Sequence, residues 1–266
     1  MADTANPIRL SISNIAWDKA DDEVVYAEMQ AHGFAGLELA PTRVFPQDPY
    51  DQLSSAALFG GYLKNKWGFA VPSIQSIWYG QQGSIFNAGE AERLLDYTAG
   101  AYQFAHALNC PSLVFGCPKN RTLAEGDDPA AGDRFFRQAG TLAARYGVVL
   151  AVEANPPVYT NYLTRTADAF ALVRRLGSPG LAVNLDLSTV LANGERLRDF
   201  IADLDLVSHV HISEPGLAPV RRRPEHAELA AMLKAVGYRG FVSIEMGRTS
   251  LDNVRRAIDE IAEVFA

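Results

Sequence analysis

Four side chains that can bind a metal ion occur near the ends of short apolar segments in the second half of the chain. The segments 148–153, 181–186, 206–213 and 240–245 contain Glu153, Asp186, His211 and Glu245. A parallel strand that is covered on both faces reads as a nearly continuous apolar run, so a carboxylate at its end needs a hydrogen-bonding or cationic partner. Three carboxylates and one imidazole suit a divalent cation, and the oxygen-rich set favours harder ions. The sequence therefore predicts one bound Mn²⁺, Mg²⁺, Co²⁺ or Zn²⁺.

The elements that must position these residues follow a regular alternation. Strands are expected at residues 8–15, 34–39, 69–75, 112–115 and in the four segments above. Helices are expected at 18–32, 49–67, 88–108, 128–146, 166–176, 196–204, 225–236 and 251–265. Eight strands alternating with eight helices predict one (β/α)8 TIM barrel domain over residues 1–266. A doubly wound sheet is disfavoured, because no Gly-rich phosphate fingerprint follows the first strand.

In a barrel of this kind the active site lies at the C-terminal ends of the strands, so the four candidate ligands are expected at one rim. His209 points to the same face of its strand as His211 and is expected to be a hydrogen-bonded residue one layer deeper. Further side chains are expected to contact a substrate at this rim: Asn14, Trp17, Glu38, Gln75, Trp78, Thr189, Arg221 and His226. For Glu38, which lies inside a strand, a buried structural role is the main alternative.

Two connections have a composition that suits ligand binding. Residues 76–83 read Ser-Ile-Trp-Tyr-Gly-Gln-Gln-Gly, as a loop over a small polar ligand would. Residues 221–223 are three consecutive arginines close to His226, and they could hold a substrate oxygen or a phosphate. An ordinary surface loop and a solvated basic cluster are the respective alternatives.

Composition limits the classes of function. A chain of 266 residues with 48% hydrophobic content can bury a large core. The net charge of -7 argues against nucleic acid or anionic membrane as a partner. Signal-peptide and membrane-spanning patterns are missing, so a cytoplasmic location is expected. Cys110 and Cys117 flank one expected strand, too far apart to form a disulfide.

The residues resemble the xylose isomerase-like sugar isomerase/epimerase barrels, which include D-tagatose 3-epimerase-like enzymes and inosose isomerases or dehydratases. The resemblance spans nearly the whole chain and is carried by segments 11–17, 36–39 and 237–245 and by the four candidate ligands. It implies that these four bind the metal and that Glu153 and Glu245 transfer protons. The family's Asp-x-x-His motif reads Asp186-Leu-Ser-Thr189 here, so a hydroxyl replaces an imidazole that would contact a substrate oxygen. Either the substrate is bulkier at this position, or another group such as His226 or an arginine of 221–223 reaches in to compensate.

The implied activity is a metal-dependent isomerisation or epimerisation of a sugar, sugar phosphate or inosose through an enediolate. A dehydratase acting on an inosose or a dehydroshikimate-like substrate would use the same ligands. An abasic-site endonuclease-like hydrolase is disfavoured by the five histidines and the acidic balance. A barrel that only binds its ligand is disfavoured by the complete four-residue set. The partner is expected to be a small carbohydrate, and a homo-oligomer remains an open option.

Overall fold

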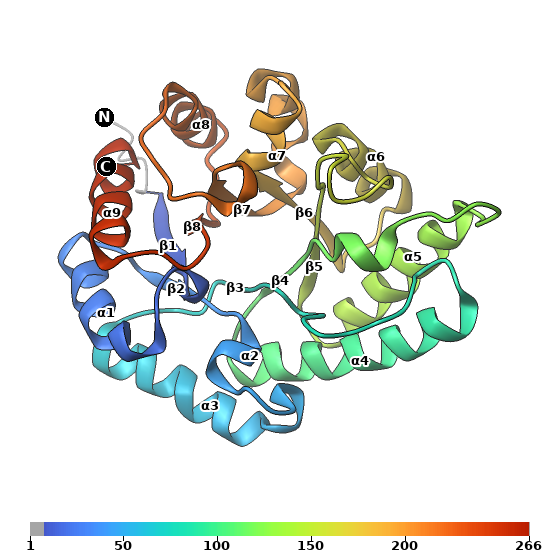
Figure 1. The fold of residues 1–266 in the computed structure, drawn as a ribbon, viewed down its shortest axis with the longest axis horizontal. Helices are drawn as coiled ribbons and strands as arrows, with labels where there is room; N and C mark the ends of the chain where they lie inside the picture. The colour runs from blue at the N-terminus through green and yellow to red at the C-terminus, as the bar shows by residue number, and fades with distance from the viewer. Residues whose placement is uncertain (1–7, 266) are drawn as a thin grey trace.

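The computed structural model describes residues 8–265, which form eight parallel strands within a ring of helices (Figure 1). The strands are β1 (Arg9–Ser13), β2 (Gly36–Glu38), β3 (Ser73–Ile74), β4 (Ser112–Phe115), β5 (Val149–Glu153), β6 (Leu181–Asp186), β7 (Val207–Ser213) and β8 (Phe241–Glu245). They belong to one sheet in the order β2-β1-β8-β7-β6-β5-β4-β3. The sheet curls into a nearly closed barrel, which confirms the expected (β/α)8 architecture.

The barrel closes at a seam between β2 and β3. Two isolated bridges join the edges there, Gly36 with Ala70 and Leu39 with Ile74. Pro72 lies between the bridged residues and has no N–H for a ladder, which explains why the strand expected at 69–75 is reduced to two residues. A Cβ atom on Gly36 would lie 2.7 Å from the Phe241 ring and 3.1 Å from Pro72. The seam therefore requires glycine at position 36.

The helices cover the outside of the barrel. They are α1 (Asp22–Ala31), α2 (Pro41–Val44), α3 (Leu53–Tyr62), α4 (Ala88–Ala107), α5 (Ala130–Arg145), α6 (Thr166–Leu176), α7 (Leu187–Ala192), α8 (Pro224–Ala235) and α9 (Leu251–Phe265). Most expected helices are present. The one expected at 49–67 is divided into a 3-10 turn, α3 and a π-helical turn, and the one expected at 196–204 is the 3-10 segment Leu197–Leu206. The short helix α7 was not expected.

The register between neighbouring strands places Asp186 directly opposite His211, with Glu153 and Glu245 each two residues away along the ladder. Glu153 pairs with Asn184, Asp186 pairs with His211, and Ser213 pairs with Glu245. Because all strands are parallel, these positions belong to the carboxyl ends of β5 to β8. The fold thus brings four consecutive strand ends of the sheet together at the rim.

Within the described part of the chain, none of the helices combines the length and apolar character that crossing a membrane requires. Cys110 is buried, Cys117 is half-buried, and both are free thiols. These placements agree with the sequence-based expectation for the two cysteines.

Candidate metal centre and substrate cavity

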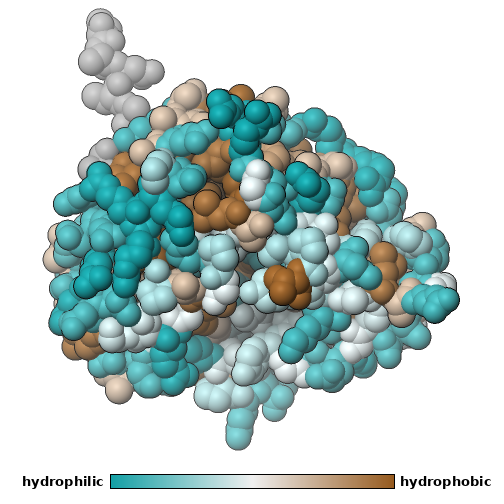
Figure 2. Space-filling model, turned by 45° about the horizontal axis from the view of Figure 1, so that its top comes forward, coloured by the Kyte–Doolittle hydropathy of each residue, from teal (hydrophilic) through white to brown (hydrophobic). Residues whose placement is uncertain are grey.

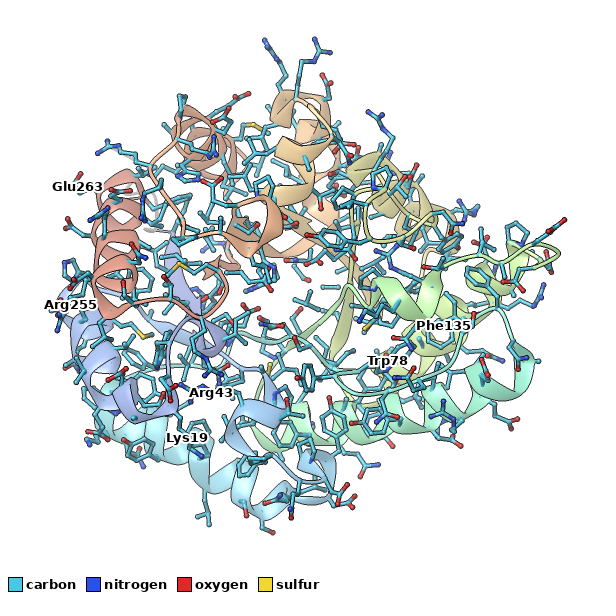
Figure 3. The ribbon with its side chains drawn as sticks, viewed as in Figure 1. Lys19, Arg43, Trp78, Phe135, Arg255 and Glu263 are labelled. Carbon is cyan, nitrogen blue, oxygen red and sulfur yellow. The ribbon has the colours of Figure 1, made fainter. Side chains whose placement is uncertain are left out.

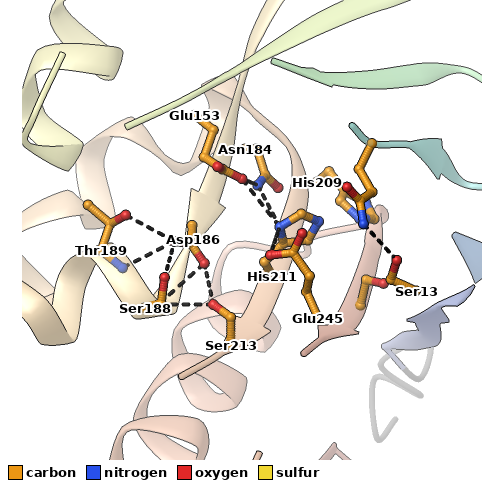
Figure 4. A network of polar contacts seen from close by, with 12 residues as sticks. Ser13, Glu153, Asn184, Asp186, Ser188, Thr189, His209, His211, Ser213 and Glu245 are labelled. Carbon is orange, nitrogen blue, oxygen red and sulfur yellow. Dashed lines mark hydrogen bonds and ion pairs between the residues drawn. The ribbon is translucent and has the colours of Figure 1, made fainter. Parts of the chain in front are cut away.

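The four candidate ligands converge around the ring of His211 (Figure 4). The Nδ1 atom of His211 lies 3.3 Å from Glu153 Oε2 and 3.2 Å from Glu245 Oε2. One potential ligand atom from each of Asp186, His211 and Glu245 lies within 4.8 Å of the others. The geometry thus directs the carboxylates of Glu153 and Glu245 toward the same imidazole nitrogen and brings Asp186 close to His211 and Glu245.

A buried carboxylate holds the other side of the same ring. Glu38 is fully buried, and its Oε1 lies 3.0 Å from Nε2 of His211 and 3.0 Å from Nε2 of His209. Its carboxylate also accepts hydrogen bonds from the hydroxyls of Ser73 and Ser243. A carboxylate that accepts the Nε2–H of a histidine fixes the ring orientation and leaves Nδ1 available to a cation. Glu38 therefore lies beneath the rim as a support for His211.

Two asparagine amides hold the carboxylate of Glu153. Asn184 donates from Nδ2 to Oε2 at 2.7 Å, and Asn155 donates from Nδ2 to Oε1 at 2.8 Å. The Oδ1 atom of Asn155 accepts from Nη2 of Arg121 at 2.6 Å. Arg121 is fully buried and also donates to the carbonyls of Gly116, Glu153, Tyr162 and Leu163. This guanidinium fixes the connection after β5 and, through Asn155, the orientation of Glu153.

Asp186 both ends β6 and caps α7. Its side chain accepts from the backbone N–H groups of Ser188 at 3.3 Å and Thr189 at 3.1 Å. The hydroxyls of Ser188 and Ser213 donate to it as well. The Thr189 hydroxyl lies 2.9 Å from Asp186 Oδ2 and 2.8 Å from the carbonyl oxygen of Ala154. Thr189 is buried, and its hydroxyl is engaged within the protein.

The electrostatics of the cluster favour a cation. Burial raises the pKa of Asp186 and that of Glu245, and repulsion from Glu153 raises the Asp186 pKa further. Burial alone would lower the pKa of His211, but Glu245 and Glu38 raise it well above its usual value. These shifts mean that the carboxylates need positive charge next to them. A divalent ion can supply that charge when it replaces the proton on Nδ1, so the donor set fits such an ion.

A cavity of about 320 Å³ opens beside the cluster. Three candidate ligands, Glu153, Asp186 and Glu245, form part of its wall. In the view of Figure 2 the surface is hollowed near its centre, and hydrophobic residues lie beside the hollow. A cavity of this size accommodates a small molecule such as a monosaccharide.

Three residues expected to contact a substrate are buried and bonded within the protein. Asn14 accepts the N–H of Ala40 at 2.8 Å, and the Trp17 indole donates to Asp22 at 2.8 Å. Gln75 donates to the hydroxyl of Ser13 at 3.0 Å. These contacts lie on β1 and the segments that follow β1, β2 and β3, with β1 paired to the ligand strand β8. Among the residues that the structure describes, the set that lines the cavity does not include these three.

Trp78, from the aromatic loop, is also turned inward. Its indole N–H donates to Thr98 at 2.9 Å, and its ring packs edge-on against Phe115 and Phe135. Figure 3 shows Trp78 close to Phe135. The loop therefore contributes this aromatic side chain to the layer between the barrel and its outer helices.

The three arginines in the connection after β7 are already paired with other side chains of the protein. Arg223 forms a two-bonded pair with Glu214, at 2.6 and 2.5 Å, and Arg221 donates to Asn253 at 2.9 Å. Arg222 pairs with Glu263 at 2.8 Å. His226 is buried in the first turn of α8, where its Nδ1 accepts the N–H of Arg223 at 3.3 Å. The structure does not bring Arg221 or His226 to the carboxylate cluster, so neither takes the place of the missing family histidine here.

Several residues around the site were not singled out from the sequence. Asn184 lies two positions before Asp186, Asn155 lies two positions after Glu153, and Ser213 lies two positions after His211. Since side chains two apart on a strand point to the same face, this spacing from each ligand was a usable signal for Asn184 and Ser213. Arg121 gave no such signal, because all of its partners except the carbonyl of Gly116 lie 32 to 42 residues away in the chain.

Eight βα units, with the candidate ligands at the carboxyl ends of the strands, define a (β/α)8 barrel with a rim site. The family model of the xylose isomerase-like TIM barrel matches residues 26–265, and the chain therefore belongs to that family. No curated protein sequence matches the chain.

Three solved structures illustrate the similarity in fold. The 3-keto-D-glucoside 4-epimerase YcjR from E. coli is 17% identical, with a TM-score of 0.77 and coverage of 97% of this chain and 98% of that one. D-psicose 3-epimerase from Clostridium cellulolyticum H10 is 14% identical, with a TM-score of 0.73 and coverage of 97% and 96%. The IolI protein with a bound zinc atom is 15% identical, with a TM-score of 0.73 and coverage of 97% and 96%.

Proposed function

We propose that this protein is a divalent-metal-dependent isomerase or epimerase that acts on a carbohydrate by proton transfer next to a carbonyl group. The observation that carries the proposal is the placement of two carboxylates on either side of one imidazole nitrogen. Glu153 from β5 and Glu245 from β8 lie 3.3 and 3.2 Å from His211 Nδ1, and both line the cavity. YcjR and D-psicose 3-epimerase, which resemble this chain in fold, are both epimerases, and this supports the same reaction class.

Glu153, Asp186, His211 and Glu245 are the residues that would hold the ion. When bound, a divalent ion supplies Lewis acidity to a substrate carbonyl and its neighbouring hydroxyl oxygen. The zinc atom bound in the IolI structure supports a metal in a barrel of this fold, and the donor set of this chain fits Mn²⁺, Mg²⁺, Co²⁺ or Zn²⁺.

The two glutamates are the groups that move the proton. Since they come from β5 and β8, with β6 and β7 between them, they can approach opposite faces of a substrate carbon in the cavity. One carboxylate removes the proton beside the carbonyl to give the enediolate, and a carboxylate then returns a proton. Asn155 and Asn184 hold both oxygens of Glu153 in place, which keeps its lone pairs directed at the substrate.

Deuterium exchange tests this assignment. Metal-loaded protein is incubated in D₂O with ketoses, aldoses and inososes, and NMR follows deuterium at the carbon beside the carbonyl. Glu153→Gln and Glu245→Gln, each with metal held saturating, should lower exchange by about 10² to 10⁴-fold, because an amide cannot act as the base. Glu228→Gln, at an exposed position on α8, is the control and should leave exchange unchanged.

The proposal fails if both single Gln variants, folded and metal-loaded, still exchange at the rate of the natural protein. Loss of water from the product, seen in the same NMR spectra, would instead identify a dehydratase, the reaction that shares this intermediate. Measurement of bound metal in each variant separates loss of the base from loss of the ion.

A further inference from the structure

The outer wall of the cavity is apolar and exposed, in contrast to its carboxylate floor. Val158 and Tyr159, between β5 and α6, are 80% and 49% exposed, and Leu217, between β7 and α8, is 41% exposed. The other apolar side chains that line the cavity are Pro118, Pro156, Ala192 and Pro215. An unsubstituted sugar has few apolar groups that could cover this wall. A contiguous apolar surface beside a polar pocket is characteristic of ligand binding.

Leu217 is held in this position at an energetic cost. Its φ of 54° lies in the left-handed region, which leucine rarely adopts. Its N–H donates to Glu214 O at 2.9 Å, and its carbonyl accepts the N–H of Gly247 at 2.8 Å. These backbone hydrogen bonds therefore hold the Leu217 side chain exposed beside the cavity. Strained backbone at a site wall points to a binding function.

The cavity has no positive side chain to offer a phosphate. Its charged lining residues in the described part of the chain are Glu153, Asp186 and Glu245, all acidic. The first N–H groups of α7 are already taken by Asp186, so this helix end is closed to an anion. Arg223 is paired with Glu214. Because a phosphate ester carries about 1.5 to 2 negative charges, this lining disfavours a phosphorylated sugar.

We propose that the substrate is an unphosphorylated sugar that has a carbonyl group on its ring and also carries an apolar substituent, as in a ring-oxidised aryl or alkyl glycoside. Its sugar ring lies against the carboxylates, and its apolar group lies against Val158, Tyr159 and Leu217. This inference rests on the proposed function, and it names the substrate class for the same site. The competing occupant of the apolar wall is a second copy of this chain.

Equilibrium binding to the metal-loaded protein tests the inference. The probes are the methyl and phenyl β-D-glycosides of glucose, galactose and xylose, together with glucose 6-phosphate and galactose 6-phosphate, titrated by calorimetry. A single methylene in an apolar pocket changes selectivity by about tenfold or more. For at least one of the sugars, the phenyl glycoside should bind at least about tenfold more tightly than its methyl counterpart, and the phosphates should bind more weakly than both.

The variant Val158→Ser/Leu217→Asn should remove most of this phenyl preference. Asparagine tolerates the left-handed backbone of position 217, and both positions are exposed, so the variant retains the fold. Leu58→Gln is the matched control, because Leu58 is 76% exposed on α3, outside the cavity, and the preference should persist there.

Equal affinity for phenyl and methyl glycosides, or a preference that survives in the double variant, would overturn the inference. Tightest binding of a sugar phosphate would also overturn it. The same holds if the natural protein is a dimer and the double variant is a monomer, since a second copy of the chain would then cover the apolar wall. If ketoses exchange deuterium while phenyl glycosides show no preference, the substrate class is wrong and the proposed function stands. The glycosides in the titration have no free carbonyl and serve only as binding probes. A phenyl preference with no solvent exchange in any ketose, aldose, inosose or ring-oxidised phenyl glycoside would reject the function and retain the apolar subsite.

Discussion

At the scale of single residues, the site depends on the two different nitrogens of His211. Nε2 faces the buried Glu38, whereas Nδ1 faces the rim carboxylates. A buried carboxylate is costly unless it is hydrogen-bonded and paired, and Glu38 meets this condition through two imidazoles and two serine hydroxyls. Glu38 has a pKa well below its usual value: burial opposes this, but the charges of His211 and His209 outweigh it. The support of the metal centre is therefore built into the barrel core.

Asn184 is the residue where this support can be tested without changing a ligand. It donates to Glu153 Oε2 at 2.7 Å and lies 3.1 Å from His211 Nδ1. Asn184→Leu keeps a similar branched shape but removes one of the polar contacts that orient each of these two ligands, so we expect affinity for Mn²⁺ to fall about 10 to 100-fold. Competition with a chelator of known affinity measures the change.

Asn193→Ala is the comparison for the Asn184 experiment. Asn193 follows α7 and donates to the carbonyl of Thr164, so its removal changes a hydrogen bond without touching the ligands. Affinity for Mn²⁺ should remain at its original value in this variant. An unchanged affinity in Asn184→Leu would show that the ligands keep their orientation without the amide.

At the scale of elements, the junction of β6 and α7 serves both the fold and the candidate metal centre, because one residue takes part in each. Asp186 is the last residue of β6 and the N-cap of α7, so strand and helix follow one another directly. A carboxylate at a helix N-terminus is stabilised by the N–H groups and the macrodipole. The Thr189 hydroxyl extends this junction to the carbonyl of Ala154, just after β5. One short helix thereby fixes two of the strand ends that carry ligands.

Thr189→Val tests whether this hydroxyl serves the fold. The substitution preserves shape but leaves the carbonyl of buried Ala154 without this donor, so we expect the free energy of unfolding to fall by about 1 to 3 kcal/mol. Urea denaturation measures the loss, and Thr189→Ser should retain most of the stability. A raised KM with unchanged stability would instead assign the hydroxyl to the substrate, the role that the sequence motif suggested.

The sequence predicted the barrel because each ligand strand is a compact apolar run between strong helical patterns. It could not predict the two-residue β3, since that depends on how Pro72 meets the edge of β2 across the seam. It also missed α7, which follows Asp186 without any loop. Local pattern is therefore sufficient for the alternation of elements, but their lengths depend on contacts with distant neighbours.

The same distinction applies to the site. Glu153, Asp186, His211 and Glu245 could be selected because each interrupts an apolar segment at its end, and the structure brings them together. The basic cluster at 221–223 could not be interpreted correctly from sequence, because the acids and amide that pair with it lie on other elements. The partners of a side chain often lie far away in the sequence, so local composition does not predict them.

At the scale of the whole molecule, the ligand strands and the seam occupy different parts of the ring. In the sheet order, β8, β7, β6 and β5 are consecutive, and β1 and β4 separate them from the edge strands β2 and β3 (Figure 1). The ligand strands are joined by ladders of four or five residue pairs, with one register shift at Val183/Asn184 between β6 and β7, whereas the seam has only isolated bridges. A cation held by four adjacent strands would therefore reinforce the more regular part of the barrel.

Metal binding should stabilise the whole fold as well as permit activity. A ligand that binds only the folded state at 100 times its Kd adds about 2.7 kcal/mol, which for a chain of this size raises the Tm by about 5 to 10 °C. We expect chelation to abolish turnover and lower the Tm, and Mn²⁺, Co²⁺ or Mg²⁺ to restore both. Calorimetry at increasing metal concentration measures the shift.

Glu245→Ala gives this experiment its comparison, because Glu245 is a ligand at the partly exposed rim and its loss creates no buried cavity. The metal-dependent rise in Tm should be smaller in this variant at every metal concentration, while the metal-free Tm should be as high as that of the natural protein or higher. The second expectation follows because burial, helped by repulsion from Asp186 and Glu38, raises the pKa of Glu245 despite its ion pair with His211, so the ionised carboxylate is unfavourable in the folded protein. An equal rise in Tm in both proteins would mean that the ion binds elsewhere. Full turnover after exhaustive chelation would show that the reaction does not require the metal.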